Sequence, residues 1–180
     1  PPPSPPTGRI RRARPELMVL MIQKEVAQRI CARPRLLRQL GGYGGQAPMN
    51  LLAVSVQFFA DAKIIGYVPA EAFWPKPKVD SAIIKIVPKR SKRNDCFKPI
   101  GLKQSFAFFR IVKAGFSQPR KQLIGNLIKK LPNKDGKITK EKLLEIFKKI
   151  SIPERARAEN LSLEQWVSLA TSLRLTTQRK

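Results

Sequence analysis

The stretch 71–86, EAFWPKPKVDSAIIKI, contains the residues of this chain best suited to chemistry. It sets an aromatic pair, Phe73 and Trp74, in a backbone stiffened by Pro75 and Pro77, because each proline fixes its own φ and favours extended geometry before it. Three lysines lie around the pair: Lys76, Lys78 and Lys85. Aromatic faces on a stiff loop among cations suit the stacking of an unpaired base beside a phosphate backbone. The alternative is the start of a strand whose aromatics belong to the core, and the residues alone leave both open.

The elements around this loop have α/β patterns. The alternation of Ala82, Ile84 and Ile86 predicts a strand over residues 80–87, and the apolar residues 63–68 predict a shorter strand that pairs with it like a hairpin. Residues 51–62 have the spacing of a helix. Its expected buried stripe is Leu52, Val56 and Phe59, widened by Leu51, Val54 and Phe58.

The amino-terminal part of the chain has three further segments. Residues 16–23 form an apolar run without alternation, which predicts a strand covered on both faces, as in a parallel sheet, and residues 24–30 have helical spacing. Residues 1–15 are rich in proline and arginine and are expected to form a disordered or extended arm. Residues 33–50 hold a GGYGG run and read as a flexible insert. That run is a weak phosphate-cradle signal, because no strand and helix frame it.

Beyond residue 88 only helical patterns occur, so we place a domain boundary there, with an α/β part over 16–88 and a basic helical domain over 89–180. Ser162 and Gln165 have the spacing of a capping box that begins the last helix. The predicted helical stripes are Phe106, Phe109 and Val112; Leu123, Ile124, Leu127, Ile128 and Leu131; Leu143, Phe147 and Ile150; and Leu163, Trp166, Val167, Ala170 and Leu173.

Composition excludes several classes of protein. The 180 residues contain two cysteines and no histidine, which argues against a disulfide framework, a Cys/His zinc site and hydrolases of the Ser-His-Asp or Cys-His type. We therefore expect no metal, and a reducing, cytoplasmic compartment. No apolar run reaches about 18 residues, so no membrane span is expected.

The charge favours a polyanion as partner. The chain has 36 basic and 12 acidic residues, a net charge of +24, and the segment 89–180 holds 23 and 7 of them. Such an excess is tolerated beside nucleic acid, the favoured partner, with an acidic membrane surface as the second choice. Three pairs of cations lie at predicted helix ends or loops, where they could contact phosphates: Lys129 and Lys130, Lys148 and Lys149, and Arg155 and Arg157.

Four segments of the chain carry specific motifs: MVLMIQKEVAQRI, AFWPKPKVDSAIIKI, the helix start FSQPRKQL, and IPERARAENLSLEQW. Together they resemble one family, the ribosomal RNA adenine N6,N6-dimethyltransferases. The resemblance covers roughly residues 16–170 apart from the glycine-rich insert, and it concerns the carboxy-terminal half of the family. It implies part of a Rossmann-like methyltransferase sheet, with its last strands and helices, followed by a small all-helical domain.

The resemblance also implies a function. Family members transfer methyl groups from S-adenosylmethionine to N6 of two adjacent adenines of small-subunit ribosomal RNA, so that RNA or the assembling small subunit is the expected partner. By position, Phe73 is one of two aromatic platforms that hold the flipped adenine. Arg120 and Lys121 match the basic residues of the family's RNA-binding segment, and Lys76 and Lys78 join them as candidate RNA contacts.

Family features are missing from the printed sequence. It has no GxGxG cofactor turn, no acidic residue after such a turn and no Asn-Leu-Pro-Tyr motif for the other aromatic platform. We therefore expect a fragment or truncated product that has no S-adenosylmethionine site of its own. The alternatives are a non-catalytic RNA-binding or ribosome-assembly module, and a generic basic DNA-binding protein.

Overall fold

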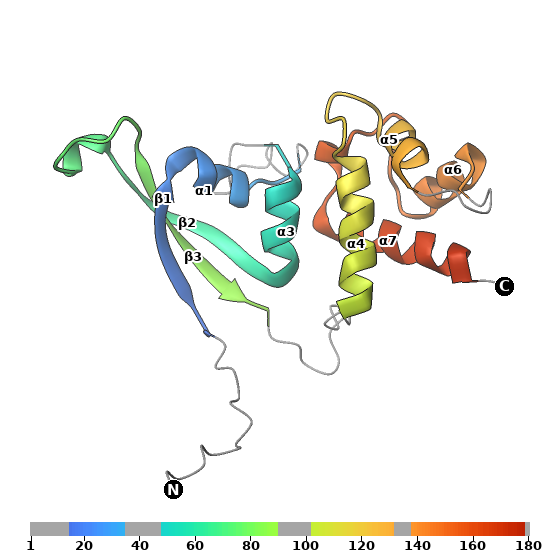
Figure 1. Cartoon of the computed structure of the whole chain (residues 1–180), viewed down its shortest axis with the longest axis horizontal. Coiled ribbons are helices and arrows are strands. Elements are labelled where there is room, and N and C mark those ends of the chain that lie inside the picture. Colours follow the sequence, from blue (N-terminus) through green and yellow to red (C-terminus); the bar gives the residue numbers. More distant parts are fainter. Residues whose placement is uncertain (1–14, 35–47, 90–101, 132–137, 179–180) are drawn as a thin grey trace, which may run out of the picture.

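The structure, a computed structural model, describes residues 15–34, 48–89, 102–131 and 138–178. The first half contains β1 (Met18–Gln23), α1 (Lys24–Ile30), α3 (Leu51–Phe59), β2 (Ala60–Val68), the 3-10 turn η1 (Ala70–Ala72) and β3 (Ser81–Pro88). The second half contains α4 (Leu102–Gly115), α5 (Leu123–Lys130), α6 (Lys140–Lys149), the 3-10 turn η2 (Ala158–Asn160) and α7 (Leu163–Gln178). Figure 1 shows the sheet on one side and α4 to α7 on the other, with α3 between them.

The sheet has three strands in the order β1-β3-β2, and both pairings are antiparallel. Ala82, Ile84 and Ile86 of β3 are buried, and they form a small core with Ala27 and Ile30 of α1. This confirms the strand that the alternation predicts, and its hairpin-like pairing with β2. The helix predicted for residues 24–30 is also confirmed.

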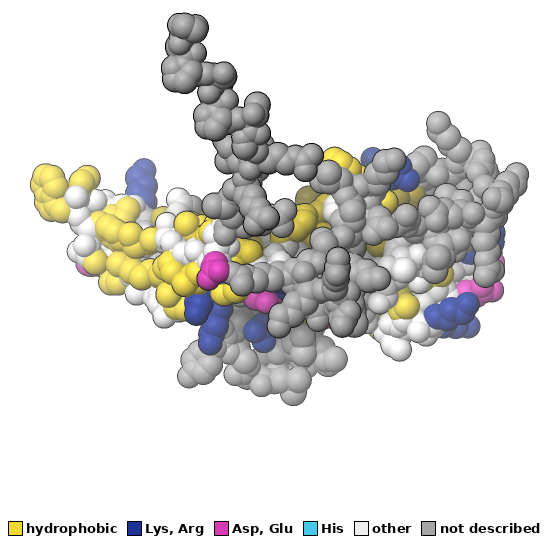
Figure 2. Space-filling model, turned by 90° about the horizontal axis from the view of Figure 1, so that it is seen from below, with side chains coloured by type: hydrophobic (Ala, Val, Ile, Leu, Met, Phe, Trp, Pro, Cys, Tyr) yellow, Lys and Arg dark blue, Asp and Glu magenta, His cyan; other side chains and the backbone are white. Residues whose placement is uncertain are grey.

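The prediction for residues 16–23 was wrong in two respects. The strand is β1, and it pairs antiparallel with β3, not parallel. It is not covered on both faces either, because Val19 and Met21 are each 54% exposed. An unbroken apolar run gives neither the direction of pairing nor the number of covered faces. Figure 2 shows hydrophobic side chains gathered over the sheet side of the molecule.

Helix α3 differs from its prediction in length and in orientation. It ends at Phe59, and β2 begins at Ala60, which pairs with Pro88 of β3. Tertiary pairing therefore decides residues 60–62, whose local pattern also fits a helix. The buried residues are Ala53, Val54 and Phe58, whereas Leu52 and Phe59 of the predicted stripe are exposed.

The orientation of α3 follows from its two neighbours. Its Phe58 ring stacks on that of Phe108 in α4, with a centroid distance of 4.4 Å, while Val56 packs against the core of the sheet. The side chain of Asn50 caps the helix by accepting from the Ala53 N–H at 3.0 Å. Helix α3 thus contributes to both cores, and a helix with two packing partners has no single buried stripe.

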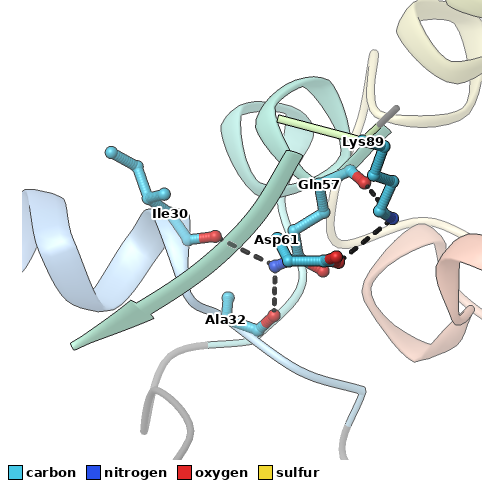
Figure 3. Close-up of polar contacts among 5 residues, drawn as sticks. All are labelled: Ile30, Ala32, Gln57, Asp61 and Lys89. Atoms are coloured by element: carbon cyan, nitrogen blue, oxygen red, sulfur yellow. Dashed lines mark hydrogen bonds and ion pairs between the residues drawn. The ribbon is translucent and has the colours of Figure 1, made fainter. Parts of the chain in front are cut away.

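One side chain of α3 ties several segments together (Figure 3). The Gln57 amide donates to the backbone carbonyls of Ile30 and Ala32, at 2.9 and 2.8 Å. The Lys89 ammonium donates to the carbonyl of Gln57 at 2.8 Å and lies 3.3 Å from the Asp61 carboxylate. These bonds hold the end of α1 and the end of β3 against α3.

The larger core lies between α3 and the carboxy-terminal helices. Its largest fully buried side chains include Phe108, Leu123, Leu127, Leu143, Phe147 and Trp166. The stripes predicted for α5, α6 and α7 supply nine of its 23 buried residues. In α4, Val112 is buried as predicted, but Phe106 is 74% exposed, because Phe108 and Ile111 face inward instead.

The start of α7 has the capping residues that the sequence predicts. The Gln165 N–H donates to Ser162 Oγ at 3.2 Å, and Gln165 Oε1 accepts from the Ser162 N–H at 3.0 Å, so the predicted capping box is confirmed.

Within the described ranges, no helix is both long and apolar enough to cross a membrane. The predicted arm up to residue 14, the part 35–47 of the predicted flexible insert, and residues 90–101 at the start of the predicted helical domain lie outside the described residues. The domain boundary at residue 88 stays a prediction.

Candidate nucleic-acid interface

The aromatic loop between β2 and β3 is fixed at its base by Asp80. One carboxylate oxygen accepts from the Ala70 N–H at 3.2 Å, and the other accepts from the Lys24 ammonium at 2.9 Å. The Lys24 N–H also donates to the carbonyl of Asp80 at 3.0 Å. Both ends of the loop are therefore attached to each other and to the start of α1.

The charges at this anchor stabilise each other. The hydrogen bond from Lys24 lowers the pKa of the Asp80 carboxyl, and the Ala70 N–H lowers it further. The same hydrogen bond raises the pKa of the Lys24 ammonium. The Tyr67 ring lies 5.7 Å from this ammonium. At neutral pH the pair is thus ionised, which suits an anchor better than a proton-transfer group.

The two aromatics on the loop differ in exposure. Phe73 is half-buried, whereas Trp74 is 96% exposed and belongs to neither core. The sequence leaves open whether the two aromatics belong to the core. For Trp74 the exposure shows that the core interpretation is wrong. A proline-rich loop can hold a large ring in solvent, because its rigidity does not depend on burying that ring.

The loop lysines are in different states. Lys76 forms an ion pair with Glu71 at 2.7 Å and thereby lowers the pKa of that carboxyl. Lys78 is exposed and forms no ion pair with any carboxylate that the structure describes. Of these two predicted RNA contacts, Lys78 is therefore the one whose charge is not already paired with a described carboxylate.

A basic cleft lies on the helical side of the molecule and has a volume of about 620 Å³. It brings together five of the cations predicted to contact RNA or its phosphates: Arg120, Lys121, Lys129, Arg155 and Arg157. Its other lining residues are Gln118, Gln122, Gly125 and Asn126. Lys148 and Lys149 are not among them; they are exposed in the last turn of α6.

Two backbone contacts explain why residues so far apart in the sequence meet. The Leu123 N–H, at the start of α5, donates to the carbonyl of Ala156 at 2.9 Å. Ala156 is buried between Arg155 and Arg157, and the Arg157 N–H donates to Asn160 Oδ1 at 3.1 Å. The arginine pair is thus held beside the turn that carries Arg120. This turn is part of FSQPRKQL, which forms the α4–α5 connection, not the helix start that was expected.

Asn126 holds the same turn from inside. It is 2% exposed, and its amide donates to the carbonyls of Gly115 and Gln118, at 2.7 and 3.0 Å. Position 115 requires glycine because two side chains pack closely against its backbone: a Cβ there would lie 2.4 Å from the Trp166 ring and 2.8 Å from Leu123. A buried amide and a glycine therefore set the course of the basic turn.

Asn126 is not among the site residues predicted from the sequence, whereas Lys129 is among the predicted phosphate contacts. A signal for Asn126 exists: it lies three positions before Lys129 on α5, so the two side chains share a face. That face could be recognised as part of the cleft only once Arg155 was placed beside it.

The cleft has the chemistry of an anion site. No acidic side chain lines it, and none of its five cations pairs with a carboxylate in the described ranges. Arginine and lysine with free donors bind phosphate oxygens, and phosphate contacts supply most of the affinity for nucleic acid. The described residues contain no group of three or more His, Cys, Asp or Glu side chains that could hold a metal.

Comparison with known proteins identifies the family. A family model described as "Ribosomal RNA adenine dimethylase" matches residues 10–174. The chain belongs to this family. Its sheet, its loop and its basic cleft are therefore those of a protein related to S-adenosylmethionine-dependent methyltransferases. The family resemblance of the four sequence segments is confirmed.

Individual relatives agree. The chain is 33% identical over 156 residues to the ribosomal RNA small subunit methyltransferase A of Geobacillus sp. (strain WCH70), covering 87% of this chain and 47% of the relative. It is 38% identical over 155 residues to the protein of that name from Crocosphaera subtropica, covering 86% and 48%. The chain thus spans about half the length of the curated relatives that it matches.

Solved structures agree on the fold. A dimethyladenosine transferase from Plasmodium falciparum superposes with a TM-score of 0.61 at 22% identity, covering 90% of this chain and 58% of the other. The 23S rRNA methyltransferase ErmE superposes with a TM-score of 0.58 at 18% identity, covering 88% and 55%. The expected fold, an α/β methyltransferase sheet in part followed by helices, is confirmed.

None of the described strands leads into a turn typical of an S-adenosylmethionine site. Such a site needs a strand that runs into a glycine-rich turn at the start of a helix. Here β1 passes from Gln23 directly into α1, β2 ends before Pro69, and β3 ends at Pro88. The only described glycine in these strands, Gly66, lies inside β2.

Proposed function

We propose that this chain is part of a ribosomal RNA adenine dimethyltransferase, a protein that methylates N6 of two adjacent adenines in small-subunit ribosomal RNA in the cytoplasm. Its own contribution is to bind the RNA and to orient the target base. The observation that carries this proposal is the basic cleft, in which five cations from three segments face one hollow and no acidic side chain occurs among the described lining residues.

The cleft supports RNA binding through phosphate contacts. Arg120 and Lys121 come from the α4–α5 turn, Lys129 from α5, and Arg155 and Arg157 from the segment before η2. If each cation neutralises one phosphate, the plot of log affinity against log salt gains a slope of about −3.5 to −4.5 from this cleft. Such contacts position the RNA and carry no sequence information by themselves.

The loop supports a second role, the orientation of an adenine. Phe73 would supply one aromatic face, since it is half-buried on a loop that Asp80 and the Lys76–Glu71 pair hold in place. The displacement at the methyl group needs an aligned N6 amine more than a strong base, so a fixed platform suits it. The comparisons do not favour the alternative, a non-catalytic module.

The test is a salt titration of RNA binding. A fragment of small-subunit ribosomal RNA is bound to the wild-type chain and to the Arg155→Ala and Lys121→Ala variants by filter binding at several salt concentrations. Each variant should reduce the slope by about 0.7–0.9, because the substitution removes one phosphate contact. Lys142→Ala is the control, an exposed lysine of α6 that does not line the cleft. Equal slopes in all variants, or equal affinity for duplex DNA of the same length, would contradict the proposal.

The cofactor is tested separately by isothermal titration. We propose that the 180 residues alone have no S-adenosylmethionine site, in line with the described strands. No heat of binding is expected at micromolar concentrations. Micromolar binding would overturn this part of the proposal and leave the RNA-binding part standing.

A further inference from the structure

Trp74 is a large apolar side chain with no use in the fold. Its indole is 96% exposed, the highest value among the large hydrophobic residues that the structure describes, and it packs against neither core. Figure 1 shows its loop, between η1 and β3, projecting from the sheet at the end remote from α4 to α7. Hydrophobic and basic side chains are seen together at this end in Figure 2.

The loop holds the indole in a defined place. Asp80 closes its base through bonds to Ala70 and Lys24, and Lys76 is paired with Glu71 across it. Proline residues on both sides of Lys76 restrict the remaining backbone. An exposed ring on such a loop loses little conformational freedom when it binds a flat partner, which is the condition for affinity from a single aromatic contact.

The surroundings of the ring select the kind of flat partner. Lys78 is exposed and free of ion pairs with described carboxylates, and the whole chain has a net charge of +24. An apolar ring and a free cation on one short loop match a base and its neighbouring phosphate, since stacking and charge neutralisation then occur together. An apolar protein surface or a lipid interior would instead leave the Lys78 charge without a partner.

We propose that Trp74 stacks on an unpaired base of the bound RNA and that Lys78 contacts the phosphate next to that base. This contact is additional to the one assigned to Phe73, and it rests on the proposed RNA-binding function. Trp74 is a positioning residue, because it holds RNA at the loop and does not touch the reacting atoms. Its partner is single-stranded, since both faces of a base in a duplex are already stacked.

Fluorescence isolates this contact. The chain has two tryptophans, and Trp166 is fully buried, so the difference in emission between wild type and Trp74→Phe reports on Trp74. Stacking on a base quenches indole emission. A short single-stranded oligoadenylate should therefore quench the Trp74 signal, whereas the same oligomer with abasic sites, or as a duplex with oligouridylate, should not.

Affinity measurements complete the test. Trp74→Ala should weaken binding of the single-stranded oligomer by about 5-fold to 150-fold, and Trp74→Phe should retain most of the affinity. The salt slope should stay unchanged in Trp74→Ala and become shallower by about 0.7 in Lys78→Ala. Phe106→Ala is the matched control, because it removes another exposed aromatic, on α4, and should change nothing.

The outcomes separate this inference from the proposed function. Loss of affinity in the cleft variants with none in Trp74→Ala would overturn the stacking contact and leave the RNA-binding function intact. Quenching by the oligoadenylate in a chain that ignores small-subunit RNA would support the stacking contact and contradict the proposed function. A shift of Trp74 emission on vesicles of phosphatidylcholine and phosphatidylserine, with no response to RNA, would show that the ring is a membrane contact and overturn the inference.

Discussion

Gly115 offers the sharpest test of the packing that positions the basic cleft. A Cβ at this position would lie 2.4 Å from Cη2 of Trp166 and 2.8 Å from Cδ1 of Leu123. Neither neighbour can move easily, because both are fully buried and the Phe116 ring stacks on Trp166 with a centroid distance of 5.4 Å. Gly115→Ala therefore forces a shift of a helix end or of a core ring.

The expected size follows from two opposing effects. Overpacking of a filled core costs about 1–3 kcal/mol, while replacing a helical glycine by alanine returns about 0.5–1 kcal/mol. The net loss in the free energy of unfolding should be about 1–2 kcal/mol, which corresponds to a fall in Tm of about 2–8 °C for a chain of this size. Affinity for RNA should fall as well, because the carbonyl of Gly115 holds Asn126 and thereby the basic turn.

Gly125 provides a matched control on the next helix. A Cβ there meets nothing within 4 Å, so Gly125→Ala should stabilise the protein by about 0.5–1 kcal/mol. Urea unfolding of wild type and both variants, followed by circular dichroism, gives the two differences at a common m value. A neutral or stabilising Gly115→Ala, or an equal change of stability in both alanine variants, would refute the close packing at Gly115.

Three further predictions concern single interactions. Asn126→Ala leaves two backbone carbonyls without their donor, and it should cost about 1–3 kcal/mol in urea unfolding, with weaker RNA binding by filter assay; full retention of both would contradict the positioning role. Because the pKa of Asp80 is lowered in the folded protein, its pair with Lys24 adds stability above the unfolded pKa of about 3.9 and loses it as pH falls through the lower folded value. Lys24→Met should therefore give a shallower decline of stability between neutral and strongly acidic pH, and an unchanged acid profile would refute the linkage. Replacing Lys148 and Lys149 with alanine should lower the salt slope of RNA binding by about 1 for each phosphate that the lysine had neutralised, and an unchanged slope would mark both as solvated surface.

Local patterns in the sequence are sufficient for the elements whose environment is simple. The alternation in β3, the stripes of α5, α6 and α7, and the capping box at Ser162 all depend on residues a few positions apart. The periods of 2 and 3.6 residues are properties of the backbone, so they are visible without neighbours. The same holds for the charge of +24 and for the segments that carry the family resemblance.

Only the tertiary structure decided which faces are covered. β1 has the same apolar run whether one face or two are buried. Helix α3 buries Val54 and Phe58 in the larger core, with Phe58 stacked on Phe108 of α4, because the sheet occupies its other side. The exposure of Trp74 could not be foreseen either. Burial is a property of the neighbours that arrive from elsewhere in the chain, and a local pattern does not contain them.

The candidate site, too, could be predicted from the sequence only in part. Its residue types could be chosen from the sequence, since arginine and lysine near helix ends and an aromatic pair between prolines are recognisable locally. Their assembly could not, because Arg120 and Arg155 meet through the Leu123–Ala156 hydrogen bond. The sequence thus determined the chemistry available to this protein. Packing decided which of those groups face one cleft and which ring remains free in solvent.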